Sequence, residues 1–220
     1  MFLTAAEADS IDAQVAAVEA RTGVQVVTAV VGKSDNYAEL PWKAFALGAS
    51  LAAFGVVGED AWRPEWIAAN TALTHAVAIL GVAGLFALLA IFVPPFGRLF
   101  LRATRRDIEV RHYTQALFLT RELFKTRNRS AVLVVVSLFE RRIEILPDVG
   151  LHGRISESEW RLIVFRMAPL LREARPVHAL KGGLAAIETL LLDKGYKIAG
   201  EPGAPGSDDL PDRPIEERGA

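Results

Sequence analysis

Two long apolar stretches interrupt a chain that otherwise mixes apolar and polar positions. Residues 71–93 carry His75 as their only ionisable side chain, and residues 44–57 carry none. At a rise of about 1.5 Å per residue, the longer stretch reaches about 34 Å, which is enough to cross the apolar core of a bilayer, about 30 Å thick. Residues 42–57 reach only about 24 Å. They therefore form either a second span or a buried or re-entrant helix.

The segments before and after these stretches show the periodicities of a soluble α/β domain. Apolar positions at helical spacing predict helices over residues 4–22, 104–126, 156–171 and 176–194. Runs of β-branched or alternating residues predict strands over residues 24–32, 131–138 and 140–146, with the last two paired as a hairpin. The predicted fold class is α/β. It is a three-layer α/β/α sandwich with a small mixed sheet, interrupted by a two-helix transmembrane hairpin.

This pattern divides the chain into four segments. Residues 1–40 form the first part of the α/β domain, residues 41–95 the transmembrane helical hairpin, and residues 96–199 the second part of the domain. A hairpin crosses the membrane an even number of times, so both parts of the domain stay on one side and can fold together. Residues 200–220 are rich in Pro, Gly and acidic residues without periodicity, which predicts a disordered tail.

The charges around the apolar stretches predict the orientation in the membrane. Residues 58–70, between the stretches, carry Glu59, Asp60 and Glu65 against Arg63. Five arginines follow the second stretch: Arg98, Arg102, Arg105, Arg106 and Arg111. The positive-inside rule places this basic segment in the cytoplasm and the acidic loop outside. The sequence therefore predicts an inner (cytoplasmic) membrane protein with two spans and both termini cytoplasmic. The arginines are either the topology signal alone or also a site for anionic lipid headgroups.

Composition excludes several kinds of chemistry. The chain of 220 residues has no Cys, which excludes thiol nucleophiles, zinc–thiolate sites and disulfides. Its net charge of −1 provides no basic field for nucleic acid. The four His residues are far apart in the sequence, and GxSxG, P-loop and HExxH motifs are absent. The predicted partners are therefore the lipid bilayer and a membrane protein, with no nucleic acid.

Four segments outside the hairpin resemble the TPM domain family. The resemblance rests on the Leu3–Thr4 start, Thr22–Gly23 before the first strand, residues 138–151 (LFERRIEILPDVGL) and residues 182–190 (GGLAAIETL). The run ERRIEI followed by an Asp and a Gly, directly after a buried strand, is the most specific of these features. The resemblance implies an α/β/α sandwich. It is similar to a bacterial membrane-anchored branch of the family, in which a transmembrane hairpin interrupts the domain.

The resemblance also implies a metal site, because some TPM-domain proteins bind divalent metal near the strand ends. Carried over by position, the ligands are Asp35 and Asn36 after the first strand, Asp148 after the third, and backbone oxygen near Gly150. Oxygen ligands suit Ca²⁺ or Mg²⁺, provided that the two loops converge at one end of the sheet. The alternative is that Asp148 caps a Pro–Asp turn and Asp35 lies in a solvated loop. Residues 151–153 also depart from the family pattern, which has a Gly-rich stretch ending in an acid.

Three classes of function remain after these steps. The first is a metal-binding or protein-interaction and regulatory module, anchored to the membrane on its cytoplasmic face. The second is a metal-dependent phosphatase, since acid phosphatase activity is assigned to some members of the family that the chain resembles. The third is a channel or transporter subunit, which is disfavoured because His75 is the only ionisable group within the apolar stretches. The first class is preferred, since the sequence carries no complete set of catalytic residues.

Overall fold

The computed structural model describes residues 2–62, 71–126, 128–197 and 214–219. These residues belong to two compact units, Met1–Asp35 with Asp107–Ala220, and Asn36–Arg106. The first is called the α/β unit below and the second the hairpin unit. The α/β unit is thus assembled from two parts of the chain that are separated in sequence by the hairpin unit.

Within the described residues, one sheet of four strands forms the centre of the α/β unit. Its strands are β1 (Gln25–Val31), β2 (Ala131–Ser137), β3 (Arg142–Pro147) and β4 (Ile215–Glu217), in the spatial order β3-β2-β1-β4. β1 is parallel to both β2 and β4, whereas β2 and β3 are antiparallel. The sheet is therefore mixed, as the sequence predicts, and β1 and β2 are its central strands.

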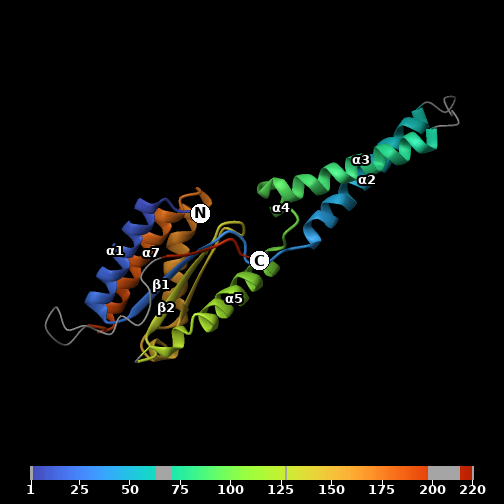
Figure 1. The fold of residues 1–220 in the computed structure, drawn as a ribbon. Helices are drawn as coiled ribbons and strands as arrows, with labels where there is room; N and C mark the ends of the chain where they lie inside the picture. The colour runs from blue at the N-terminus through green and yellow to red at the C-terminus, as the bar shows by residue number, and fades with distance from the viewer. Residues whose placement is uncertain (1, 63–70, 127, 198–213, 220) are drawn as a thin grey trace. The chain divides into compact units, whose positions relative to one another are not determined.

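Helices cover both faces of this sheet (Figure 1). One face packs against α1 (Ala5–Thr22), α6 (Glu157–Arg172) and α7 (Pro176–Asp193), and the other against α5 (Ala103–Thr120) and the short η1 (Leu123–Lys125). Val26 and Val30 of β1 contribute to the first core, and Val27 and Val31 to the second, because alternate residues of a strand face opposite sides. The predicted three-layer α/β/α sandwich is confirmed.

The helix starts of the α/β unit follow from local sequence. Thr4 and Glu7 form the predicted capping box, in which the Thr4 N–H donates to Glu7 Oε2 at 2.8 Å and the Glu7 N–H donates to Thr4 Oγ1 at 3.3 Å. Ser156 and Glu159 form the second one at the start of α6. Gly23 ends α1 with a φ of 68°, a left-handed conformation that glycine adopts without a steric penalty.

The C-terminal segment differs from the prediction. Residues 200–213 lie outside the described residues, but Ile215–Glu217 form β4 beside β1. The prediction of a disordered tail is therefore wrong for this segment. Its residues form too short a run to show strand periodicity, and their partner strand lies almost the full length of the chain away in sequence.

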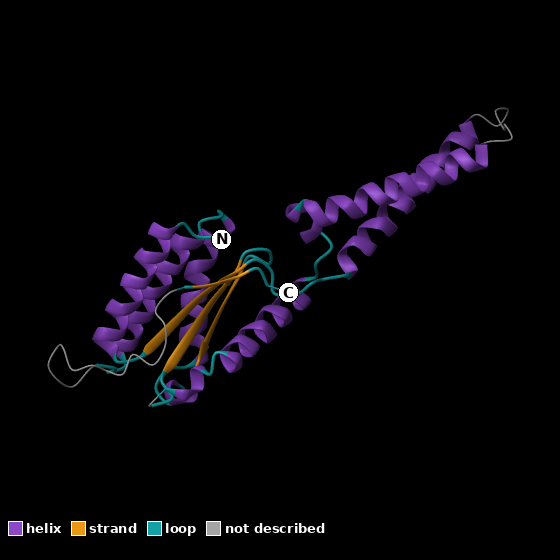
Figure 2. Ribbon diagram, viewed as in Figure 1, coloured by secondary structure: helices purple, strands orange, loops and turns teal. Residues whose placement is uncertain are grey.

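The hairpin unit contains two long apolar helices, α2 (Glu39–Trp62) and α3 (Thr71–Phe92), which pack along each other (Figure 2), and the short α4 (Pro94–Arg98). A Cβ added to Gly48 would lie 2.9 Å from the Phe86 ring and 3.0 Å from the Ala83 Cα, so glycine permits the close approach of α2 and α3. Both helices are long and apolar enough to cross a membrane. The 24 residues of α2 span about 36 Å, more than the sequence pattern predicts.

Candidate functional site

The two aspartates predicted to share a metal ion lie at opposite ends of the sheet. Asp35 follows the carboxyl end of β1. Because β3 is antiparallel to β2, its last residue Pro147 pairs with Val132 near the start of β2, and the Asp148 N–H donates to the Ala131 carbonyl at 2.8 Å. The expectation that their loops converge is therefore wrong. A single ion cannot be bound by both carboxylates in this fold.

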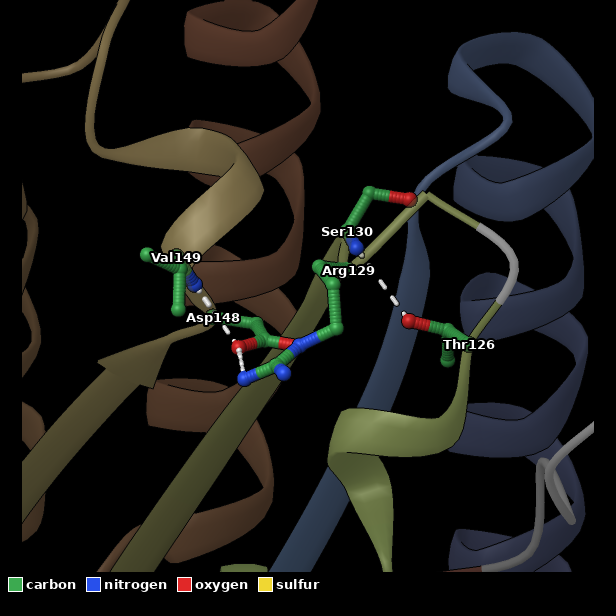
Figure 3. A network of polar contacts seen from close by, with 5 residues as sticks. All are labelled: Thr126, Arg129, Ser130, Asp148 and Val149. Carbon is green, nitrogen blue, oxygen red and sulfur yellow. Dashed lines mark hydrogen bonds and ion pairs between the residues drawn. The ribbon is translucent and has the colours of Figure 1, made fainter.

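Asp148 lies in a network of polar contacts at the amino end of β2 (Figure 3). Its carboxylate accepts hydrogen bonds from Arg129 Nε and Nη2, each at 2.9 Å, and from the Val149 N–H at 2.7 Å. The side chain is 2% exposed, and the carboxylate raises the pKa of Arg129 mainly through these hydrogen bonds. Asp148 thus closes the turn that leads into η2 (Val149–Leu151) and ties it to the segment before β2.

Gly150 belongs to the same turn. Its N–H donates to the Arg129 carbonyl at 2.9 Å. A Cβ at this position would lie 2.4 Å from the Asn128 carbonyl oxygen and 2.6 Å from that of Arg129. Glycine is therefore needed here because two segments of backbone approach each other. The contacts of Asp148 and Gly150 correspond to the turn-capping role that the sequence left open as the alternative to metal binding.

We expect Asp148→Asn to lower the melting temperature of the chain in metal-free buffer. Asparagine keeps the size of the side chain but loses the charge-assisted, two-pronged contact with Arg129. The measurement is thermal unfolding of the full chain in lipid nanodiscs, with and without millimolar Ca²⁺ or Mg²⁺, beside Asp35→Asn. A stabilisation by either cation that disappears only in Asp148→Asn, with no change in metal-free stability, would contradict this structural role.

Sequence reasoning missed a buried carboxylate at the other end of the sheet. Glu140 lies in the turn between β2 and β3 and is 1% exposed. Its Oε1 accepts the Ser34 N–H at 2.9 Å, and its Oε2 accepts the Ser137 hydroxyl. The Ser34 hydroxyl in turn donates to Ser137 Oγ at 3.0 Å. Its place at the start of the ERRIEI run was the available signal, but the run was interpreted as a strand from residue 140 and as a mark of family resemblance, whereas the strand begins at Arg142.

The first residue of β3, Arg142, holds the returning chain. Arg142 Nε donates to Asp107 Oδ1 at 2.6 Å, and Arg142 Nη2 donates to the second oxygen. Asp107 is the first residue of the α/β unit after the hairpin unit. Ser34 is the second-last residue of the α/β unit before the hairpin unit, which begins after Asp35. Glu140 in the turn and Arg142 at the start of β3 therefore bind the two chain segments of the α/β unit that lead to the hairpin unit.

These contacts define one site, which we call the junction cluster. It comprises Ser34, Asp107, Ser137, Glu140 and Arg142. Glu144, two residues further along β3, adds a half-buried carboxyl whose pKa is raised, because the effect of burial exceeds the opposing effect of the nearby charges of Arg111 and Arg142.

The chemistry of the junction cluster is that of a structural joint. Both oxygens of Glu140 accept hydrogen bonds from the protein, and Asp107 is paired with arginine. Among the residues that the structure describes, no group of three or more His, Asp or Glu side chains is arranged to hold a metal ion. The cluster therefore fixes the position of two chain segments.

The fold and the junction cluster described above belong to an α/β/α domain whose sequence is interrupted by a pair of apolar helices. Residues 99–190 match a family model described as the TPM domain, so the chain contains a TPM domain in its second part. The match includes the ERRIEI run and the turn at Asp148, on which the resemblance in the sequence rested. No curated protein gives a significant match to this sequence.

A solved structure shares the fold. The NMR structure of the BA42 protein from the psychrophilic bacterium Bizionia argentinensis aligns with a TM-score of 0.56, over 98% of this chain and 96% of that one. The two sequences are 12% identical, so the likeness concerns the fold.

Proposed function

We propose that this chain is a membrane-anchored TPM-domain protein whose α/β unit acts as an interaction or regulatory module on the cytoplasmic face of the inner membrane. Its hairpin unit spans the membrane twice, and its partners are the lipid bilayer and a membrane protein. The observation that carries this proposal is the exposed apolar surface of α2 and α3. The junction cluster holds the two segments of the module from which the chain continues to the anchor.

The surface of the hairpin unit supports membrane insertion. Only 17% of the most apolar window of α2 and 11% of that of α3 is buried, whereas the core helix of a soluble protein is mostly buried. Phe54 is 81% exposed, and Leu73, Val77 and Leu80 are also exposed. Apolar surface of this extent is stable in the hydrocarbon of a bilayer or against other membrane helices.

A regulatory role is supported by the way the chain is connected. A hairpin attached at one terminus would leave the fold of a neighbouring domain untouched. Here both connections enter the α/β unit through residues that are held at the β2–β3 hairpin, one by Glu140 in the turn and one by Arg142 at the start of β3. Both chain segments that lead to the membrane anchor therefore leave the α/β unit next to the end of the central strands β1 and β2, where a partner of the module can reach them.

Metal binding by the loop after β1 remains a prediction, separate from the turn that contains Asp148 and Gly150. Asp35 and Asn36 supply oxygen atoms beyond the carboxyl end of β1, and Ca²⁺ or Mg²⁺ is the chemically suited ion. The comparison of Asp35→Asn with Asp148→Asn described above separates this site from the turn at the opposite end of the sheet.

The proposed topology predicts which positions a membrane-impermeant maleimide reaches. The chain has no native Cys, so each variant carries one thiol. Gly58→Cys and Gly182→Cys form a matched pair, because a Cβ at either position meets no atom within 4 Å. We expect Gly58→Cys to be labelled in intact spheroplasts, and Gly182→Cys only after lysis.

Two outcomes of this labelling would overturn the proposal. Labelling of Gly182→Cys in intact spheroplasts would place the α/β unit outside the cytoplasm. Protection of both positions until lysis, with the chain recovered in the soluble fraction, would exclude a transmembrane hairpin. A chain recovered in the membrane fraction with both positions protected would replace the two spans by a re-entrant helix pair.

A further inference from the structure

The outer edge of β1 is covered in two different ways. Toward its start, the Val26 N–H donates to Glu19 Oε1 of α1 at 2.7 Å, so a side chain covers this part of the edge. Toward its end, Ala29, Val30 and Val31 pair with β4, and the Gly32 N–H donates to the Glu217 carbonyl at 3.0 Å. A strand from the C-terminal end of the chain thus occupies a site on the edge of a seven-residue central strand.

The α/β unit contacts the side chains of this strand at two adjacent positions, through backbone N–H groups at Glu216 and through side chains at Glu217. Glu216 Oε2 accepts the Phe2 N–H at 2.5 Å and the Leu3 N–H at 3.4 Å, where the chain enters α1. Glu217, on the other side of the strand, accepts the Tyr113 hydroxyl at 2.5 Å and Arg121 Nη2 at 2.9 Å, both from α5. The contacts with Tyr113 and Arg121 lower the pKa of Glu217, so they favour a charged carboxylate.

The edge also selects the shape of its occupant. A Cβ on Gly32 would lie 2.8 Å from the Arg218 carbonyl oxygen, and one on Gly219 would lie 1.6 Å from that of Lys33. Gly219 has a φ of 83°, which favours glycine. Ile215 precedes the two glutamates and packs at the margin of the core beneath α5. The site therefore fits an extended strand with an apolar residue, two acidic residues and, two positions after the second acid, a glycine.

The same contacts indicate that the strand can be exchanged. All three side chains of β4 are only half-buried, and the side chains of the Arg121–Glu217 pair are 47% and 36% exposed. Ion pairs of this exposure contribute little to stability. Short segments held by exposed contacts open locally at a small cost in free energy compared with the core strands.

We propose that the outer edge of β1 is a docking site for an extended peptide strand with an apolar–Glu–Glu sequence, which the chain's own Ile215–Glu217 fills as an intramolecular competitor. A partner presenting such a strand adds to the sheet in parallel with β1 and displaces β4. Main-chain hydrogen bonds supply affinity in strand addition of this kind, and side-chain contacts supply specificity. The inference rests on the proposed role as an interaction module, but it does not depend on membrane insertion.

The test uses the full chain in detergent micelles and a fluorescent peptide of residues 211–220, PDRPIEERGA. In the double variant Glu216→Lys, Glu217→Lys, the tail loses both anionic contacts and places positive charge beside Arg121. We expect this variant to bind the peptide at least tenfold more tightly than the wild-type chain does, because its own tail no longer competes. A control peptide, PDRPIKKRGA, is expected to bind at least tenfold more weakly to the same variant.

Hydrogen exchange of single amides shows whether the peptide binds at the outer edge of β1. The Gly32 amide is expected to exchange faster in the double variant and to regain its protection when PDRPIEERGA is added, while the Leu133 amide in β2 stays protected throughout. Equal affinity of variant and wild type for the peptide, equal binding of both peptides, or no change at Gly32 would each overturn the proposal. Because no membrane is present in this assay, its failure is distinguishable from a failure of the labelling experiment.

Discussion

Replacing Glu140 by alanine is expected to lower the free energy of unfolding of the α/β unit by about 3–5 kcal/mol. The substitution removes a carboxylate that is 1% exposed, and it leaves the Ser34 N–H and the Ser137 hydroxyl without their acceptor. Each buried polar group left without a partner costs about 1–3 kcal/mol, and the vacated volume adds to this. Thermal unfolding of the full chain in nanodiscs should show a decrease of roughly 10 °C or more.

Glu140→Gln is the matched control for this prediction. The amide oxygen can accept the Ser34 N–H, and the amide nitrogen can donate to Ser137 Oγ, so the two groups keep partners in nearly the same volume. We expect its loss of stability to be less than half that of Glu140→Ala. Equal and small losses in both variants would contradict the assignment of Glu140 as the residue that holds the segment after β1.

The apolar pattern predicted the layers of the α/β unit because its central strands are buried on both faces. Every position of β2 is buried, and its sequence AVLVVVS is apolar up to its last residue. The cap of α1 was equally readable, since Thr4 and Glu7 bind each other within one turn. Local sequence determines both features, so no knowledge of distant contacts was needed.

The position of Asp148 could also have been deduced from the sequence. The ERRIEI run was expected to pair with its predecessor as a hairpin, and a hairpin returns the chain to the start of the preceding strand. Asp148 therefore lies beside Ala131, whereas Asp35 lies beyond the opposite end of the parallel β1. The order of the strands alone does not distinguish the two ends of the sheet, whereas their direction does.

Glu140 and β4 depended on contacts that local patterns do not contain. Glutamate in a turn is ordinarily solvated, and its burial here requires Ser34, which is 106 positions away in sequence. β4 pairs with a strand near the other end of the chain, and two of its three residues are glutamates. Long-range pairing of so short a segment is invisible to periodicity.

Introducing one methyl group at Gly150 is expected to destabilise the α/β unit by about 3 kcal/mol. In Gly150→Ala the new Cβ would lie 2.4 Å from the Asn128 carbonyl oxygen, which is backbone and cannot rotate away as a side chain would. The turn must therefore shift away from the segment before β2. That movement lengthens the hydrogen bond from the Gly150 N–H to the Arg129 carbonyl. It also lengthens the contact of Asp148 with the Arg129 side chain.

Gly153→Ala tests whether the effect comes from this close approach. A Cβ at Gly153 meets no atom within 4 Å, although the residue lies only three positions further along the chain. We expect its unfolding free energy to stay within about 0.5 kcal/mol of the wild type. Combined with Asp148→Asn, Gly150→Ala should cost less than the sum of the two single changes, because both act on the same turn. An equal loss in Gly153→Ala would show that the effect does not come from the close approach. Full additivity of Gly150→Ala and Asp148→Asn would show that the turn does not act as one unit.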